Sequence, residues 1–135
     1  NLVDVAIDAL NYLDQNENGF VIMIEQAHID KYCHHSTFLD ICAAVSNLNE
    51  TVEAVMNWLG DRTDTAVLVT ADHETGGIKY NSSTDSYYYT TGSHSNVNVP
   101  LCAMGAGTEI FNKAVENVEI AKFIAKIFGA QKFGQ

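Results

Sequence analysis

Six residues in three short stretches of this sequence carry side chains that bind metal ions: Glu25, Asp30 and His34, then Asp72 and His73, then His94. Carboxylates and imidazoles together form a ligand set that zinc accepts in catalytic sites, where one position stays open for substrate. A single histidine or aspartate on a polar loop is more often a surface residue than a ligand. From spacing alone, a metal site and a set of unconnected surface residues are equally good interpretations.

The metal-capable stretches are placed by short apolar runs that predict β-strands. Residues 20–24, opened by Gly19, are almost wholly apolar, as expected for a strand buried on both faces of a parallel sheet. Residues 66–69 form a second run, residues 97–104 a third, and residues 78–90 are expected to form a hairpin. Loops that follow the carboxyl ends of strands converge on one crevice of an α/β sheet, so the three stretches are expected to meet.

Helical periodicity predicts the elements around these strands. Apolar residues recur every three or four positions over residues 37–59, with Ser36 as the expected N-cap and Gly60 as the stop. Residues 2–13 and 115–128 show the same pattern. A strand, helix and strand in this order predict a right-handed crossover. We therefore expect an α/β fold over residues 1–135 as a single segment: part of a mostly parallel sheet flanked by helices, with a small β-hairpin insertion.

Composition narrows the class of protein. Seventeen acidic residues against seven Lys and Arg give a net charge of −10, which argues against a nucleic-acid partner. No run of about 18 apolar residues predicts a membrane span. The three cysteines are too few and too widely spaced to predict a disulfide framework, and Cys42 and Cys102 are expected in the core. The sequence begins inside an amphipathic pattern without Met, from which we expect a truncated chain.

The residues around the candidate ligands resemble the alkaline phosphatases. The resemblance covers nearly the whole chain in the family's order, through EQAHID at residues 25–30 with His34, TADHETGG at residues 70–77, and GSH at residues 92–94 leading into Val99 and Pro100. The central ADHETGG is the most specific of these elements. The resemblance implies hydrolysis of phosphate monoesters by the parent protein.

The resemblance also implies a role for each candidate ligand. Asp30, His34 and His94 match the residues that hold one zinc ion, which activates the attacking water. Asp72 and His73 match part of the site for a second zinc ion, which polarises a serine nucleophile. Two cations about 4 Å apart stabilise the attacking and leaving oxygens of an in-line phosphoryl displacement. Zn²⁺ is therefore expected at two sites in the parent protein.

Glu25 matches a carboxylate that helps to hold Mg²⁺ in the family, which suits a hard cation that prefers oxygen ligands. The family usually has Gly after this Glu, whereas this chain has Gln26, which is expected to crowd the turn. Nothing in the sequence matches the family's serine nucleophile or its phosphate-binding Arg, and Arg62 is expected in a solvent loop. We expect a C-terminal part of the catalytic domain that is inactive alone.

Three hypotheses about function stay open at the level of sequence. The first is an alkaline phosphatase, and the second is a metal-dependent phosphomutase or sulfatase of the same superfamily. The third is a non-catalytic metal-binding fragment that acts through association. A cut parallel sheet leaves unpaired edges and apolar faces, so self-association or a homodimer is expected. The family resemblance further implies a periplasmic or extracellular location.

Overall fold

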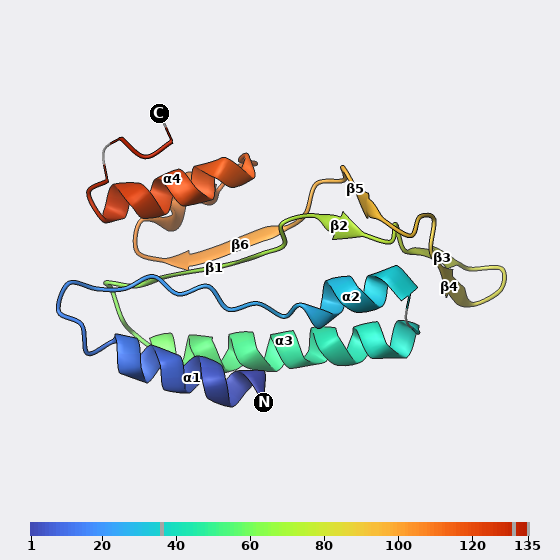
Figure 1. The fold of residues 1–135 in the computed structure, drawn as a ribbon, viewed down its shortest axis with the longest axis horizontal. Helices are drawn as coiled ribbons and strands as arrows, with labels where there is room; N and C mark the ends of the chain where they lie inside the picture. The colour runs from blue at the N-terminus through green and yellow to red at the C-terminus, as the bar shows by residue number, and fades with distance from the viewer. Residues whose placement is uncertain (36, 131, 135) are drawn as a thin grey trace.

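A computed structural model describes residues 1–35, 37–130 and 132–134, with the side chain of His35 outside the described part. The chain is arranged in layers (Figure 1). Helices α1 (Leu2–Leu13), α2 (His28–His35) and α3 (Phe38–Leu59) lie on one side of a β-ribbon, and helix α4 (Asn117–Ile127) lies on the other. No helix among the described residues is long and apolar enough to cross a membrane.

Helix α3 is the longest element and packs against both α1 and α2. A capping box fixes its start: the Thr37 hydroxyl accepts a hydrogen bond from the Asp40 amide, and the Asp40 carboxylate accepts one from the Thr37 amide. The helix ends at Gly60, which has a φ of 50°. The bounds expected for this helix are confirmed to within one residue. The N-cap is Thr37, and the expected cap Ser36 lies outside the described residues.

Among the described residues the strands form three separate two-stranded ladders, and all three are antiparallel. Strand β1 (Ala66–Thr70) pairs with β6 (Leu101–Gly105), with Leu68 opposite Ala103. Strand β2 (Glu74–Thr75) pairs with β5 (His94–Ser95), and β3 (Lys79–Asn81) pairs with β4 (Ser86–Tyr88). The mostly parallel sheet is therefore not confirmed, because no parallel ladder occurs within the described part of the chain.

Residues 20–24, expected as a buried parallel strand, form no strand. They run in the same layer as β1 without pairing to it (Figure 1). Their exposure alternates, since Val21 and Met23 are exposed while Ile22 and Ile24 are half-buried. Only one face of residues 20–24 therefore packs against the rest of the protein, and their backbone groups take part in no described β-ladder. The third expected strand is shorter than predicted, because β6 begins at Leu101 rather than at residue 97.

The hairpin expected over residues 78–90 is confirmed as β3 and β4, and it docks on the start of α3. The ring of Tyr87 stacks on that of Phe38, with centroids 3.8 Å apart and an interplanar angle of 9°. Asp85 lies in the hairpin turn with a φ of 49°. Tyr87 therefore packs the hairpin against α3. A short 3-10 helix η1 (Thr108–Phe111) and α4 complete the chain.

The core is small for a chain of this composition. Its apolar part comprises Ala6, Leu10, Cys33, Ile41, Ala44, Leu59, Phe111, Phe123 and Ala125. Most of these side chains lie on the three N-terminal helices, while Phe111 and Phe123 pack edge to face between η1 and α4. Cys42 and Cys102 were expected in the core and are exposed, because they lie on the outer faces of α3 and β6.

Candidate metal centre

One group of metal-capable side chains forms in the described part of the chain, and it consists of Asp30, His34 and His94. Each offers one ligand atom, and these atoms lie within 4.8 Å of one another. Asp30 and His34 come from consecutive turns of α2, whereas His94 comes from β5. The Asp30 Oδ1 atom is 3.4 Å from Nε2 of both histidines. The family resemblance groups these three residues, and the fold brings them together.

Helix α2 explains how the first two ligands meet. Residues four apart on an α-helix lie on the same face, so Asp30 and His34 point in one direction. No helix was expected over residues 28–35, although the spacing of these two ligands is itself helical. A Gln26 side-chain oxygen accepts a hydrogen bond from the His28 amide at the start of the helix. A side chain from the loop before α2 thus caps the start of this helix.

The orientation of His34 is set by a backbone carbonyl. Its Nδ1 lies 2.9 Å from the oxygen of Gly92. A carbonyl only accepts hydrogen bonds, so Nδ1 carries the proton and Nε2 keeps a lone pair. The lone pair of Nε2 faces Asp30, which is the arrangement that a metal-binding histidine requires. Gly92 also precedes β5, so the same contact ties α2 to the segment that carries His94.

The hydroxyl of Thr75 donates a hydrogen bond to Asp30 Oδ1 at 2.7 Å. This bond lowers the pKa of Asp30 below its ordinary value; the partial burial of the carboxyl opposes the shift, and the nearby imidazoles reinforce it. Asp30 is therefore ionised over the whole neutral range. An ionised carboxylate is the form that binds a cation.

Asp72 and His73 lie next to the trio. They follow β1 directly, and the Asp72 Oδ2 atom is 3.4 Å from His73 Nε2. The His73 ring stacks on the His94 ring with centroids 3.5 Å apart and an interplanar angle of 20°. Asp72 is exposed, and its carboxylate also accepts a hydrogen bond from the His73 amide. The second predicted pair thus borders the first site through stacked histidines.

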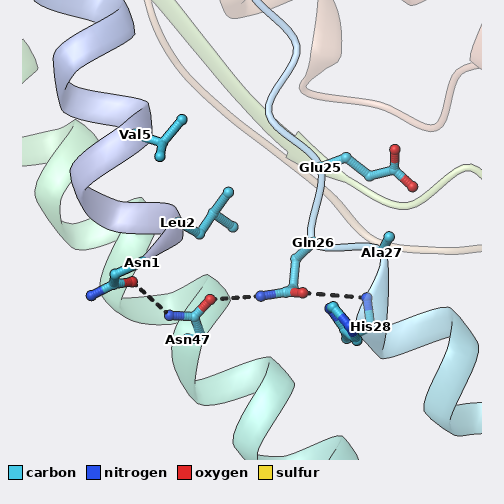
Figure 2. Close-up of a pocket in the computed structure, with 8 residues that line it drawn as sticks. All are labelled: Asn1, Leu2, Val5, Glu25, Gln26, Ala27, His28 and Asn47. Atoms are coloured by element: carbon cyan, nitrogen blue, oxygen red, sulfur yellow. Dashed lines mark hydrogen bonds between the residues drawn. The ribbon is translucent and has the colours of Figure 1, made fainter.

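Glu25 is not part of any three-ligand group among the described residues. Its side chain borders an open pocket of about 440 Å³ and points away from Leu2 and Val5 (Figure 2). The neighbouring Gln26 does not crowd the turn, because its φ is not positive. The Gln26 amide instead donates a hydrogen bond of 2.6 Å to Asn47 on α3. The expectation about Gln26 was wrong, since this turn does not need glycine.

Three supporting residues have no individual signal in the sequence. Thr75 is one, and the carbonyl of Gly92 is another. The third is Glu74, whose carboxylate accepts hydrogen bonds from the Gly77 amide at 2.8 Å and from the Ser95 hydroxyl. The signal that could have found Glu74 and Thr75 is their place within ADHETGG, directly after the Asp72 and His73 pair.

Gly76 allows a close approach of the backbone beside the site. Its φ is 85°, and a Cβ there would lie 2.7 Å from the carbonyl oxygen of Cys33 in α2. The Gly76 amide donates to the Ser93 carbonyl at 3.0 Å, which extends the contact between β2 and β5. The backbone at Gly76 therefore touches both segments that carry the trio.

Two further polar residues, His28 and Arg62, lie outside the trio. The His28 ring tilts against Tyr32 with centroids 5.3 Å apart, and it lies outside the group of three ligands. Arg62 lies in the loop after α3, as expected, and its guanidinium donates two hydrogen bonds to the Asp14 carboxylate. Nothing is described of the His35 side chain.

Fold and site together define an α/β protein in which helix α2 and strand β5 bring a carboxylate and two histidines together. A profile of the family described as alkaline phosphatase matches residues 1–91. The chain belongs to the alkaline phosphatase family.

Individual relatives agree with this assignment. Alkaline phosphatase 4 of Bacillus subtilis (strain 168) is 24% identical over 147 residues, which cover 98% of this chain and 32% of that protein. Alkaline phosphatase of Escherichia coli (strain K12) is 32% identical over 72 residues, covering 53% of this chain and 15% of its own length. The chain thus spans about a third of the length of the Bacillus relative.

Solved structures show the same fold. The cold-active alkaline phosphatase from Shewanella sp. superposes with a TM-score of 0.89 at 20% identity, over 95% of this chain and 50% of that one. The alkaline phosphatase from the Antarctic bacterium TAB5 gives a TM-score of 0.78 at 30% identity, over 90% of this chain and 38% of that one. A mutant of the TAB5 protein is described with Mg bound in its M3 site.

Proposed function

We propose that the protein to which this chain belongs hydrolyses phosphate monoesters, and that this chain supplies most of its metal ligands. The observation that carries the proposal is the meeting of Asp30, His34 and His94 within 4.8 Å. Membership of the alkaline phosphatase family gives the class of substrate. The nucleophile belongs to the part of the parent protein that precedes this chain.

The trio fits zinc by the chemistry of its donors. Two imidazole nitrogens and one carboxylate oxygen are the ligand types that catalytic zinc takes, and three protein ligands leave a fourth position for substrate. When bound, zinc supplies Lewis acidity to a phosphate ester. The Gly92 carbonyl orients His34, and the Thr75 hydroxyl orients Asp30. These partners hold the ligand atoms in place before a metal ion arrives.

Asp72 and His73 are proposed as ligands of a second zinc ion, completed by a residue from the preceding part of the parent. The stacking of His73 against His94 supports two neighbouring cations, because ligands of both sites lie side by side. Glu25 is proposed as a Mg²⁺ ligand, also completed from outside this chain. A carboxylate next to an open pocket is consistent with a ligand that awaits its partners.

We further propose that the isolated chain associates with itself. The ladder of β1 and β6 has free edges, and many large apolar side chains are exposed, Val21, Met23, Val97 and Met104 among them. Surfaces of this kind usually find a partner. We also propose export of the parent protein to the periplasm or the cell exterior, which the family resemblance implies.

Zinc binding tests the trio. The 135-residue chain is expected to bind zinc weakly in titration calorimetry, with loss of affinity in Asp30→Asn and His94→Ala. Each loss should exceed the roughly 10- to 100-fold that removal of an outer hydrogen-bond partner costs a metal site. His28→Ala is the matched control, since His28 lies outside the trio. Equal affinity in His94→Ala and the wild type would contradict the assignment.

Turnover of a chromogenic phosphate ester tests the activity. The isolated chain should not hydrolyse p-nitrophenyl phosphate, whereas the full-length parent should, and Asp72→Ala in the parent should abolish the activity. Robust hydrolysis by the purified chain, unaffected by Asp72→Ala, would overturn both statements. Sedimentation of the chain as a stable, fully soluble monomer would contradict the proposed self-association.

A further inference from the structure

Thr75 connects the two predicted metal sites through one hydroxyl group. Its Oγ1 lies 2.7 Å from Asp30 Oδ1 in the trio and 3.2 Å from His73 Nδ1 in the neighbouring pair. The side chain is buried, with 8% of the residue's surface exposed, whereas the ligands around it are half-buried or exposed. Water is therefore poorly placed to replace either contact.

The number of protons on this hydroxyl decides the direction of both contacts. A threonine hydroxyl has one proton to donate and lone pairs to accept. The ionised Asp30 carboxylate only accepts, so the proton of Thr75 points to Asp30. Oγ1 must then accept from His73, which requires the proton of the neutral imidazole to sit on Nδ1. In this tautomer the Nε2 lone pair faces the Asp72 carboxylate across 3.4 Å, and a cation between these two acceptors would satisfy both.

We propose that Thr75 is a positioning residue that fixes the tautomer of His73 while it holds the Asp30 carboxylate. This inference rests on the proposed metal sites and assigns to one side chain the orientation of a ligand in each. The hydroxyl prepares His73 to bind a cation through Nε2 on the Asp72 side. A metal-binding histidine needs such a partner on its other ring nitrogen, and here the partner is a hydroxyl already polarised by a carboxylate.

The alternative is that Thr75 only packs. Its place in the two-residue strand β2, opposite His94, would suit any β-branched side chain. Valine has nearly the shape of threonine and lacks the hydroxyl, so Thr75→Val keeps the packing and removes both hydrogen bonds. Thr75→Ser keeps the hydroxyl, and Thr75→Ala removes both hydroxyl and methyl. Thr51→Val is the matched control, because Thr51 is also buried and donates to the Asn47 carbonyl on α3, away from the site.

The first readout is the tautomer of His73 in the metal-free chain. Nitrogen-15 NMR at mildly alkaline pH, where histidines are neutral, distinguishes a proton on Nδ1 from one on Nε2. The wild type, Thr75→Ser and Thr51→Val should show His73 protonated on Nδ1. Thr75→Val and Thr75→Ala should shift His73 toward the Nε2 form. A His73 signal that is the same in Thr75→Val and the wild type overturns the inference.

The second readout is the affinity for zinc, added alone. Thr75→Val should lose about 10- to 100-fold, the usual cost of removing an outer partner of a metal ligand. Thr75→Ser should recover most of the affinity, and Thr51→Val should not change it. Equal losses in Thr75→Ser and Thr75→Val overturn the inference. If the wild type fails to bind zinc, the proposed function is contradicted. The inference about Thr75 is still tested in that case, because the tautomer of His73 is measured without metal.

Discussion

Replacement of Gly76 by alanine should destabilise the chain more than the same change at any open glycine. Gly76 has a φ of 85°, in the region where a side chain strains the backbone. The new Cβ would lie 2.7 Å from the Cys33 carbonyl oxygen and 2.9 Å from a ring carbon of Tyr89. The carbonyl belongs to helix α2 and cannot rotate away. The backbone of β2 or of α2 must therefore move.

Two costs set the size of this effect, and one gain reduces it. A left-handed backbone costs an L-residue about 1–2 kcal/mol. Forcing a methyl group into an occupied space costs about 1–3 kcal/mol more. Alanine returns about 0.4–1 kcal/mol by restricting the unfolded chain. The free energy of unfolding should therefore fall by about 1–5 kcal/mol, a large share of the stability of an ordinary domain.

Two other glycines separate the two terms. Gly129 has a φ of 73°, and no atom of the described residues lies within 4 Å of the position that a Cβ would take, so Gly129→Ala carries the backbone cost alone. Gly92 has neither a positive φ nor a close neighbour, so Gly92→Ala should not destabilise. Urea unfolding followed by circular dichroism should rank Gly76→Ala well below Gly129→Ala, with Gly92→Ala highest. If Gly76→Ala costs no more than Gly129→Ala, the argued contact with Cys33 is refuted.

Two further predictions concern regions outside the metal centre. Hydrogen bonds from Arg62 lower the pKa of Asp14. This pair should therefore stabilise the fold above pH 3.8 and lose its effect as the pH falls through the lower pKa of the folded state. In urea unfolding at a series of acidic pH values, Asp14→Asn should reduce the fall of the midpoint with pH, and Asp8→Asn should not. Cys33 is buried while the other two cysteines are exposed, so a thiol reagent should give two fast reactions and one slow one. A fast third reaction that Cys33→Ser removes would contradict the described burial.

Helices α1, α3 and α4 and the pairing of Asp30 with His34 could be predicted because their signals are local. The period of apolar residues marks α1, α3 and α4, and a helix closes its hydrogen bonds within its own segment. Asp30 and His34 are four residues apart, so they share a helix face wherever that helix packs. The hairpin was also predictable, since its turn residues stand between its two strands. For His94, the position depended on the family resemblance and not on spacing.

Strand pairing could not be predicted, because a strand finds its partner elsewhere in the sequence. Residues 20–24 look like a buried strand by composition alone, yet they form no ladder, and β1 pairs antiparallel with β6. An apolar run indicates that a segment can be buried, but it does not identify the strand with which that segment pairs. The same limit explains why Cys42 and Cys102 are exposed. Their apolar neighbours in the sequence suggested burial, but they do not determine which side chains pack together.

Little regular structure holds the ligand trio together. His94 reaches the trio through a ladder of two residues, in which it stands opposite Thr75. A slip of one residue would turn His94 to the other face, because side chains alternate along a strand. The register is held by Glu74, which accepts a hydrogen bond from the Ser95 hydroxyl, and by the Gly76 amide, which donates to the Ser93 carbonyl. A metal ion bound to the trio would tie β5 to α2 directly. Part of its binding free energy would then go into ordering β5, which is the physical reason to expect weak zinc binding by this chain alone.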